Sequence, residues 1–249
     1  MRIGRVATAA GTVDVRWSAD GPVPISSPLR AFAVGEEPVD IGAPLVGARL
    51  LPAAAPALLV GIAQNGPSHV APVQAWLKSP RTIVADGVPV RLRRDAGTPV
   101  AEAEIAVVIG RDTTGLTARN AHEYILGVTA VNDLSSPDRT AVDPRNFESK
   151  SGVGYTPLGA WIDTDLVAAA TGAGDLVLSL EIDGVEVART DAAALPVPIS
   201  ECLAYLAAWT PLGPGDVIMT GAPFSSSPIA AGQRVDVRVG EIRLTTPTR

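Results

Sequence analysis

The sequence predicts a mixed α/β fold in which strands outnumber helices. Three observations lead to this fold class: short apolar or alternating runs recur along the chain, only two segments have convincing helical character, and Asp183-Gly184 separates two alternating runs. Alternation with a period of two is typical of half-buried strands, and Asp-Gly between such runs is a strong hairpin signal. No repeat with a period of roughly 20 to 50 residues is visible, so a solenoid or propeller is not expected.

Strand-like runs divide the chain into a short N-terminal part and a longer remainder. Residues 2–7 and 12–18 alternate on either side of a turn-forming Thr-Ala-Ala-Gly stretch, and an Ala/Pro-rich hinge follows at residues 50–57. We therefore predict a small β-rich subdomain over residues 1–53 and a larger domain over residues 54–249. Further strands are expected in the larger domain at residues 58–64, 82–92, 103–110, 176–188, 216–223 and 233–244.

Two segments are expected to be helical. Residues 117–131 begin with Thr117, and residues 198–209 contain Ser200, and both side chains are of a type that caps helix N-termini. The single cysteine, Cys202, lies in the second segment and is expected to pack as a small hydrophobic residue. A lone cysteine excludes an internal disulfide and a cysteine-based zinc cluster.

Charge and hydropathy narrow the classes of partner. The formal net charge is −6 and Lys and Arg are scattered along the chain, so no basic face for nucleic acid or anionic lipid is expected. The sequence does not open with a signal-peptide pattern, and no uninterrupted apolar run reaches the roughly 18 residues of a membrane span. We expect a cytoplasmic protein that binds neither nucleic acid nor membrane.

Two like charges stand at the start of one of the most apolar runs in the chain. In a strand, residues i and i+2 share a face, so Glu102 and Glu104 point to one side while Ile105, Val107 and Ile109 point to the core. Carboxylates held side by side in a poorly solvated place repel each other, and a cation between them removes the repulsion.

Asp133 is a third carboxylate in a similar setting, because it follows the apolar end of the first expected helix where a loop begins. Three carboxylates without a nearby histidine or cysteine are hard oxygen ligands, suited to Mg²⁺ or Mn²⁺ rather than to zinc. From spacing alone a second interpretation stays open, in which Glu102 and Glu104 lie on a solvated strand face and Asp133 caps a turn.

Four motifs in this chain resemble those of the fumarylacetoacetate hydrolase family in order and spacing, and the resemblance covers residues 57 to 249. The motifs are EAEIAVVIGRD, GVTAVNDLSSPD, ESKSGVGYTPLGAWI and PLGPGDVIMTGAP. The resemblance implies a β-roll catalytic domain and a Mg²⁺ or Mn²⁺ ion held by Glu102, Glu104 and Asp133. It also implies a homodimer, expected through the C-terminal β-rich domain, which agrees with 47% apolar residues and a mean hydropathy of +0.25.

The resemblance also assigns roles to residues around the metal. Lys150 matches the family lysine that faces the oxygens of a bound keto acid, and Thr220 matches a position that touches the substrate carboxylate. Lys78 is carried over as a further substrate-binding residue. A solvated loop lysine at Lys150 and a plain backbone turn at Thr220 are the structural alternatives.

Two positions depart from the family pattern. His69 matches a catalytic histidine on a lid, but the glutamate that orients it three residues later is replaced by Pro72. The family arginine four residues past the metal aspartate is replaced by Pro137, so Arg139 or Arg145 is expected to supply the positive charge instead, and Arg139 is assigned to substrate binding.

The resemblance implies chemistry on a 2-oxo acid or a 1,3-dicarbonyl compound: hydrolysis of a C–C bond, loss of CO₂ or tautomerisation. All three pass through an enolate that a chelated metal ion stabilises. The loop after Asp133 resembles the decarboxylase and isomerase branch of aromatic-acid catabolism. A non-catalytic keto-acid-binding protein or partner subunit is the alternative. A serine hydrolase and a dinucleotide-binding enzyme are disfavoured, because no G-x-S-x-G elbow occurs and SGVGYTPLG has the wrong glycine spacing.

Overall fold

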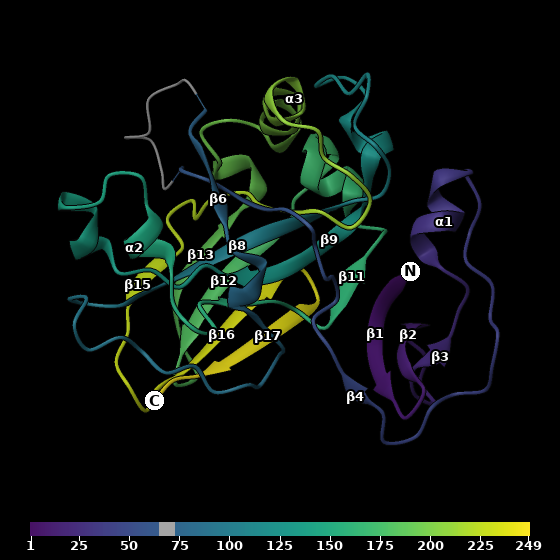
Figure 1. Ribbon diagram of the computed structural model, residues 1–249, viewed down its shortest axis with the longest axis horizontal. Helices are drawn as coiled ribbons and strands as arrows, with labels where there is room; N and C mark the ends of the chain where they lie inside the picture. Colours follow the sequence, from purple (N-terminus) through teal and green to yellow (C-terminus); the bar gives the residue numbers. More distant parts are fainter. Residues whose placement is uncertain (65–72) are drawn as a thin grey trace.

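Strands dominate the computed structural model, which describes residues 1–64 and 73–249 (Figure 1). Within these residues the largest sheet has eleven strands, in the order β3-β2-β1-β11-β9-β8-β14-β5-β6, with β4 beside β1 and β15 beside β8. The predicted sheet-rich fold class is confirmed. The strands of this sheet are β1 (Arg2–Thr8), β2 (Gly11–Arg16), β3 (Val23–Pro24), β4 (Arg49–Leu50), β5 (Leu59–Ile62), β6 (Ala75–Lys78), β8 (Val100–Ile109), β9 (Ile125–Asn132), β11 (Trp161–Asp163), β14 (Val217–Met219) and β15 (Ser226–Pro228).

A second sheet packs against β8 and β9 and encloses the main core (Figure 1). Side chains of both sheets and of the longest described helix are buried together there. The other face of β8 is buried as well, in a smaller cluster that includes Ala106 and Val108. Burial on both faces explains why this strand is almost uniformly apolar. The second sheet has the order β13-β12-β16-β17 and consists of β12 (Val177–Ile182), β13 (Val185–Asp191), β16 (Arg234–Val239) and β17 (Ile242–Pro247).

The predicted hairpin at Asp183-Gly184 joins β12 to β13. Both turn residues have positive φ, 52° for Asp183 and 83° for Gly184. This is the requirement of a type I′ turn, whose twist matches that of the flanking strands. In contrast, the predicted strand at 82–92 is reduced to β7 (Ile83–Val84), which pairs with β10 (Thr156–Pro157), because a turn and a proline interrupt the run.

The helix predicted at residues 117–131 is wrong. Its first part contains the short 3₁₀ helix η2 (Ala121–Tyr124), and its second part is the strand β9, which is buried along its whole length between β8 and β11. A short run that is apolar on every side fits a buried strand as well as a buried helix, so periodicity could not decide. Thr117 caps no helix; its N–H and hydroxyl donate to Asn120 Oδ1 at 2.6 and 2.8 Å.

The second predicted helix is confirmed as α3 (Ile199–Trp209), although Pro198 and not Ser200 stands at its N-cap position. No described helix is long and apolar enough to cross a membrane. The other described helices are short: α1 (Pro28–Ala33), α2 (Phe147–Lys150), η1 (Pro80–Thr82), η3 (Pro137–Ala141), η4 (Ala169–Ala173) and η5 (Ala192–Ala194).

The N-terminal strands are joined to the rest of the large sheet through β1, which pairs antiparallel with β11. The pairing aligns Ile3 with Ile162, and both side chains are buried in the smaller hydrophobic cluster. The division between residues 1–53 and residues 54–249 stays a prediction.

The buried thiol of Cys202 is expected to be chemically inert in the native protein. The residue is 1% exposed on α3, and burial raises the pKa of its thiol to about 12. Because the thiolate is the reactive form, a disulfide reagent at pH 8 should label the native protein very slowly and the denatured protein at once. Rapid stoichiometric labelling under native conditions would show that α3 opens easily.

Candidate metal centre

The register of β8 and β9 brings three carboxylates together. Glu102 and Glu104 lie on β8, and Asp133 directly follows β9. The ladder continues past the end of β9, where the Asp133 N–H donates to the Glu102 carbonyl at 2.9 Å. One carboxylate oxygen from each residue can be chosen so that all three lie within 4.8 Å of one another. The three residues are only 5%, 1% and 0% exposed, so they do not lie on a solvated face.

Two buried lysines neutralise part of this charge. Lys150, at the end of α2, donates from Nζ to Glu102 Oε2 and to Asp133 Oδ2, both at 2.6 Å. Lys78, on β6, forms an ion pair with Asp133 and donates to the Tyr155 carbonyl at 2.8 Å. The chain contains two lysines, and both lie in this cluster.

Burial and the two ammonium groups move the pKa values in the cluster apart. Burial, reinforced by the carboxylates of Asp133 and Glu102, raises the pKa of Glu104 well above its usual value. Burial also acts to raise the pKa of Asp133, but Lys150 and Lys78 outweigh it and lower that pKa. Burial lowers the pKa of Lys78, whereas the carboxylates outweigh burial and raise the pKa of Lys150. Lys150 therefore stays charged.

Glu104 contacts no ammonium group among the described residues. Its Oε2 accepts one hydrogen bond, from the Gly221 N–H at 2.8 Å, whereas Glu102 also accepts from the Ser135 hydroxyl at 2.9 Å. A buried carboxylate with so little compensation favours the approach of a further cation. The cluster offers only carboxylate oxygens, the ligand type of Mg²⁺ and Mn²⁺. The donor set of Glu102, Glu104 and Asp133 therefore fits the predicted metal.

A turn after β14 holds Glu104 in place. Thr220 donates to the Ile105 carbonyl from its N–H at 3.1 Å and from its hydroxyl at 2.9 Å. Gly221 has φ +99°, and a Cβ there would lie 2.5 Å from the Gln64 carbonyl oxygen, so the turn requires glycine. The buried Gln64 amide donates to the Thr220 carbonyl at 2.8 Å. The predicted contact of Thr220 with a substrate carboxylate stays a prediction.

Trp76 and Tyr155, which the sequence analysis did not identify, contact the two lysines. Trp76 shares a face of β6 with Lys78, and Lys150 Nζ lies 5.2 Å from the centre of a Trp76 ring. The buried Trp76 indole N–H has no hydrogen-bond partner among the described residues. Tyr155 is fully buried and supplies the carbonyl that binds Lys78. The alternation of β6 could have identified Trp76, whereas the contact of Tyr155 depends on the tertiary fold.

Comparison with known proteins identifies the family of this chain. The family model described as "Fumarylacetoacetate (FAA) hydrolase C-terminal" matches residues 53–247, which contain all three carboxylates and both lysines. The chain belongs to the fumarylacetoacetate hydrolase family. The resemblance carried by the four sequence motifs is thereby confirmed.

Three of the relatives have names that include an isomerase activity. A structure of a 5-carboxymethyl-2-hydroxymuconate delta-isomerase from Mycobacterium smegmatis has a TM-score of 0.88 and 32% identity and covers 100% of this chain and 99% of its own. A 2-hydroxyhepta-2,4-diene-1,7-dioate isomerase from Mycobacterium marinum has a TM-score of 0.87 and 29% identity and covers 100% and 98%. A bifunctional isomerase/decarboxylase of 4-hydroxyphenylacetate degradation from Escherichia coli is 28% identical over 70% of this chain and 39% of its own length.

Two further predicted site residues are not part of the described cluster. Arg139, in η3, forms an ion pair with Glu148 near the surface and contacts none of the three carboxylates. Its predicted role in substrate binding is untested. His69 and Pro72 lie outside the described residues, so the predicted role of His69 stays a prediction.

We expect calorimetry to show one Mg²⁺ or Mn²⁺ ion bound per chain and Glu104→Ala to abolish this binding. The substitution removes one of three oxygen ligands, and the two that remain are already engaged by lysines. Glu123→Ala is a matched control, because Glu123 is exposed and the charge change is the same. Unchanged metal affinity in Glu104→Ala would refute the assignment.

Proposed function

We propose that this protein is a divalent-metal-dependent enzyme that acts on a 2-oxo acid or a 1,3-dicarbonyl compound. The observation that carries the proposal is the buried cluster of three carboxylates and two lysines. Burying so many charged groups is costly for folding, and such clusters are typical of functional sites. The names of the relatives, isomerases and an isomerase/decarboxylase, support chemistry through an enolate.

The residues of the cluster have complementary tasks in this reaction. Loss of CO₂ or of a proton next to a 2-oxo group leaves negative charge on the former carbonyl oxygen, and the Lys150 ammonium stabilises that charge. The raised pKa of Lys150 keeps it positive, and burial away from water strengthens the interaction. Lys78 holds Asp133 in position through its ion pair. A cation held by the three carboxylates would act as a Lewis acid toward the same oxygen.

Within the family reactions, we propose isomerisation or decarboxylation rather than hydrolysis. Hydrolysis requires a positioned base that activates water. In this sequence Pro72 stands where the family resemblance leads one to expect the glutamate that orients His69. An enolate reaction without a water nucleophile needs mainly an electron sink and a proton donor, and the names of the relatives agree with this branch.

We expect Lys150→Ala to lower kcat by roughly 10²-fold or more on a substrate that the protein converts, because a fixed positive charge is lost where negative charge develops. His69→Ala should cost much less if the reaction is isomerisation or decarboxylation. The measurement is steady-state kinetics with Mg²⁺ or Mn²⁺ on oxaloacetate, acylpyruvates and 2-hydroxyhexadienedioates, with products identified by mass.

Arg119→Ala controls this experiment, since it removes an exposed positive charge away from the cluster. A nearly inactive His69→Ala enzyme would indicate hydrolysis instead. Wild-type kcat in Lys150→Ala would contradict the proposed mechanism. Saturable binding of these acids without turnover of any of them would favour the non-catalytic keto-acid-binding alternative.

We also propose that the chain forms a homodimer through its C-terminal β-rich domain. Strand β13 is an edge strand of the four-stranded sheet, and it exposes Val185 and Val187 at 64% and 44%. Exposed apolar side chains on a sheet edge favour association with another chain. Light scattering at micromolar concentration should give twice the 25.5 kDa chain mass. A monomer mass would contradict this proposal.

A further inference from the structure

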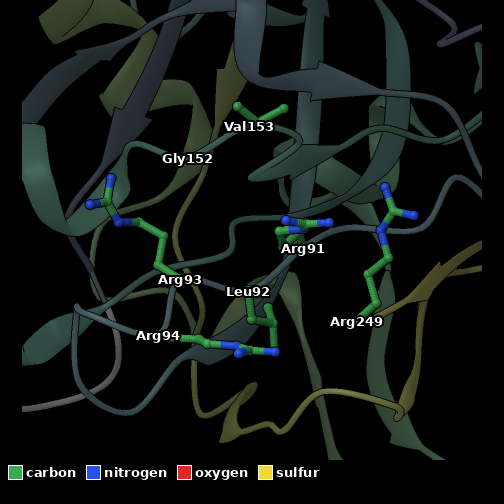
Figure 2. Close-up of a pocket in the computed structure, with 7 residues that line it drawn as sticks. All are labelled: Arg91, Leu92, Arg93, Arg94, Gly152, Val153 and Arg249. Carbon is green, nitrogen blue, oxygen red and sulfur yellow. The ribbon is translucent and has the colours of Figure 1, made fainter.

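A hollow of about 630 Å³ lies outside the acidic cluster and is lined mainly by arginines (Figure 2). None of the three carboxylates and neither lysine lines it. We call it the arginine pocket. Its lining residues are Arg91, Leu92, Arg93, Arg94, Gly152, Val153 and Arg249.

The fold assembles this pocket from segments that are distant in the sequence. Val90 and Thr248 form a parallel bridge. The Leu92 N–H donates to the main-chain oxygen of Arg249 at 2.9 Å, and the Arg249 N–H donates to the Val90 carbonyl at 2.9 Å. The Arg93 N–H donates to the Tyr155 hydroxyl, also at 2.9 Å. These bonds fix the main chain from which the arginine side chains extend, so this part of the pocket is in place before any ligand arrives.

Among the described residues, one of the four arginines in the pocket pairs with a carboxylate side chain. Arg93 pairs with Asp95 through bonds of 3.1 and 2.8 Å. For Arg91, Arg94 and Arg249 the described residues provide no side-chain carboxylate within ion-pair distance. Figure 2 shows the guanidinium groups of Arg93, Arg91 and Arg249 spaced across the hollow, with Arg94 beside Leu92. Like charges gathered in this way, in a protein of net charge −6, are stabilised by a bound anion.

The pocket also has apolar surface. Leu92 is 7% exposed and lies among the arginines, and Val153 is 90% exposed on the opposite side (Figure 2). A ligand with a short hydrocarbon chain covers these apolar side chains while its charged ends reach the guanidinium groups. An inorganic anion interacts with the guanidinium groups and makes no apolar contact.

We propose that the arginine pocket binds a small organic anion with two or three carboxylate groups on a short hydrocarbon chain. This site is separate from the acidic cluster of Glu102, Glu104 and Asp133. Guanidinium groups bind carboxylate and phosphate oxygens through paired hydrogen bonds, so several of them around one hollow favour more than one oxyanion group.

The buried residue Tyr155 connects the arginine pocket with the acidic cluster. Its hydroxyl accepts from Arg93, and its carbonyl accepts from Lys78. Its N–H donates to the carbonyl of Gly152, which lines the pocket two residues after Lys150. An anion in the pocket therefore contacts the loop that leads from Lys150, and this loop is expected to gain protection from hydrogen exchange when the anion binds.

The test is calorimetry of metal-free protein with propane-1,2,3-tricarboxylate, with pyrophosphate as the probe for charge alone. We expect saturable tricarboxylate binding that weakens with salt. Arg91→Glu and, separately, Arg94→Gln should each weaken it by roughly tenfold or more, because charge-assisted hydrogen bonds are lost. Arg119→Glu is the matched control, since it exchanges an exposed arginine elsewhere and should leave binding unchanged. Binding should persist in Glu104→Gln.

Tighter binding of the tricarboxylate than of pyrophosphate supports the proposed class, and equal or weaker binding overturns it. The proposal is also overturned if the tricarboxylate does not saturate, or if Arg91→Glu binds like wild type while retaining its melting temperature. Loss of binding in Glu104→Gln would place the ligand at the acidic cluster instead. If light scattering gives Arg91→Glu a different mass from wild type, the pocket is a contact between subunits, and this result also overturns the proposal.

Discussion

The burial of three carboxylates at the meeting point of β8 and β9 is the constraint on which the rest of this structure depends. Ionised groups are removed from water only when other groups compensate them. The compensation here comes from several parts of the chain: Lys150 ends α2, Lys78 ends β6, and the turn at Gly221 follows β14. Both lysines of the chain lie beside these carboxylates.

Strand register controls this arrangement. A shift of one residue between β8 and β9 would turn Glu102 and Glu104 to the opposite face and bring apolar side chains into their place. The two strands are buried on both faces by the rest of the protein, so such a shift would also disrupt the core. The packing that stabilises the sheet is thus the same packing that positions the candidate metal ligands.

The candidate metal centre and the arginine pocket differ in the charged groups that they gather. Three carboxylates and two lysines lie together in the metal centre, four arginines line the pocket, and Tyr155 contacts residues of both. The formal net charge of −6 gives no sign of either site. Arg91, Arg93 and Arg94 stand together in the sequence, and Arg249 joins them through backbone pairing near the end of β17.

The sequence by itself determined the sheet-rich fold class, the turn at Asp183-Gly184, the family and the three candidate metal ligands, because each of these depends on neighbouring residues or on motifs read in order. It failed for residues 117–131, because the largely apolar run from Ile125 has no period that separates strand from helix. Only the tertiary structure showed the contacts of Trp76 and Tyr155 with the lysines and the position of Arg249 beside Arg91, Arg93 and Arg94. These contacts join residues far apart in the chain, and it is the packing of the sheets and loops that brings them together.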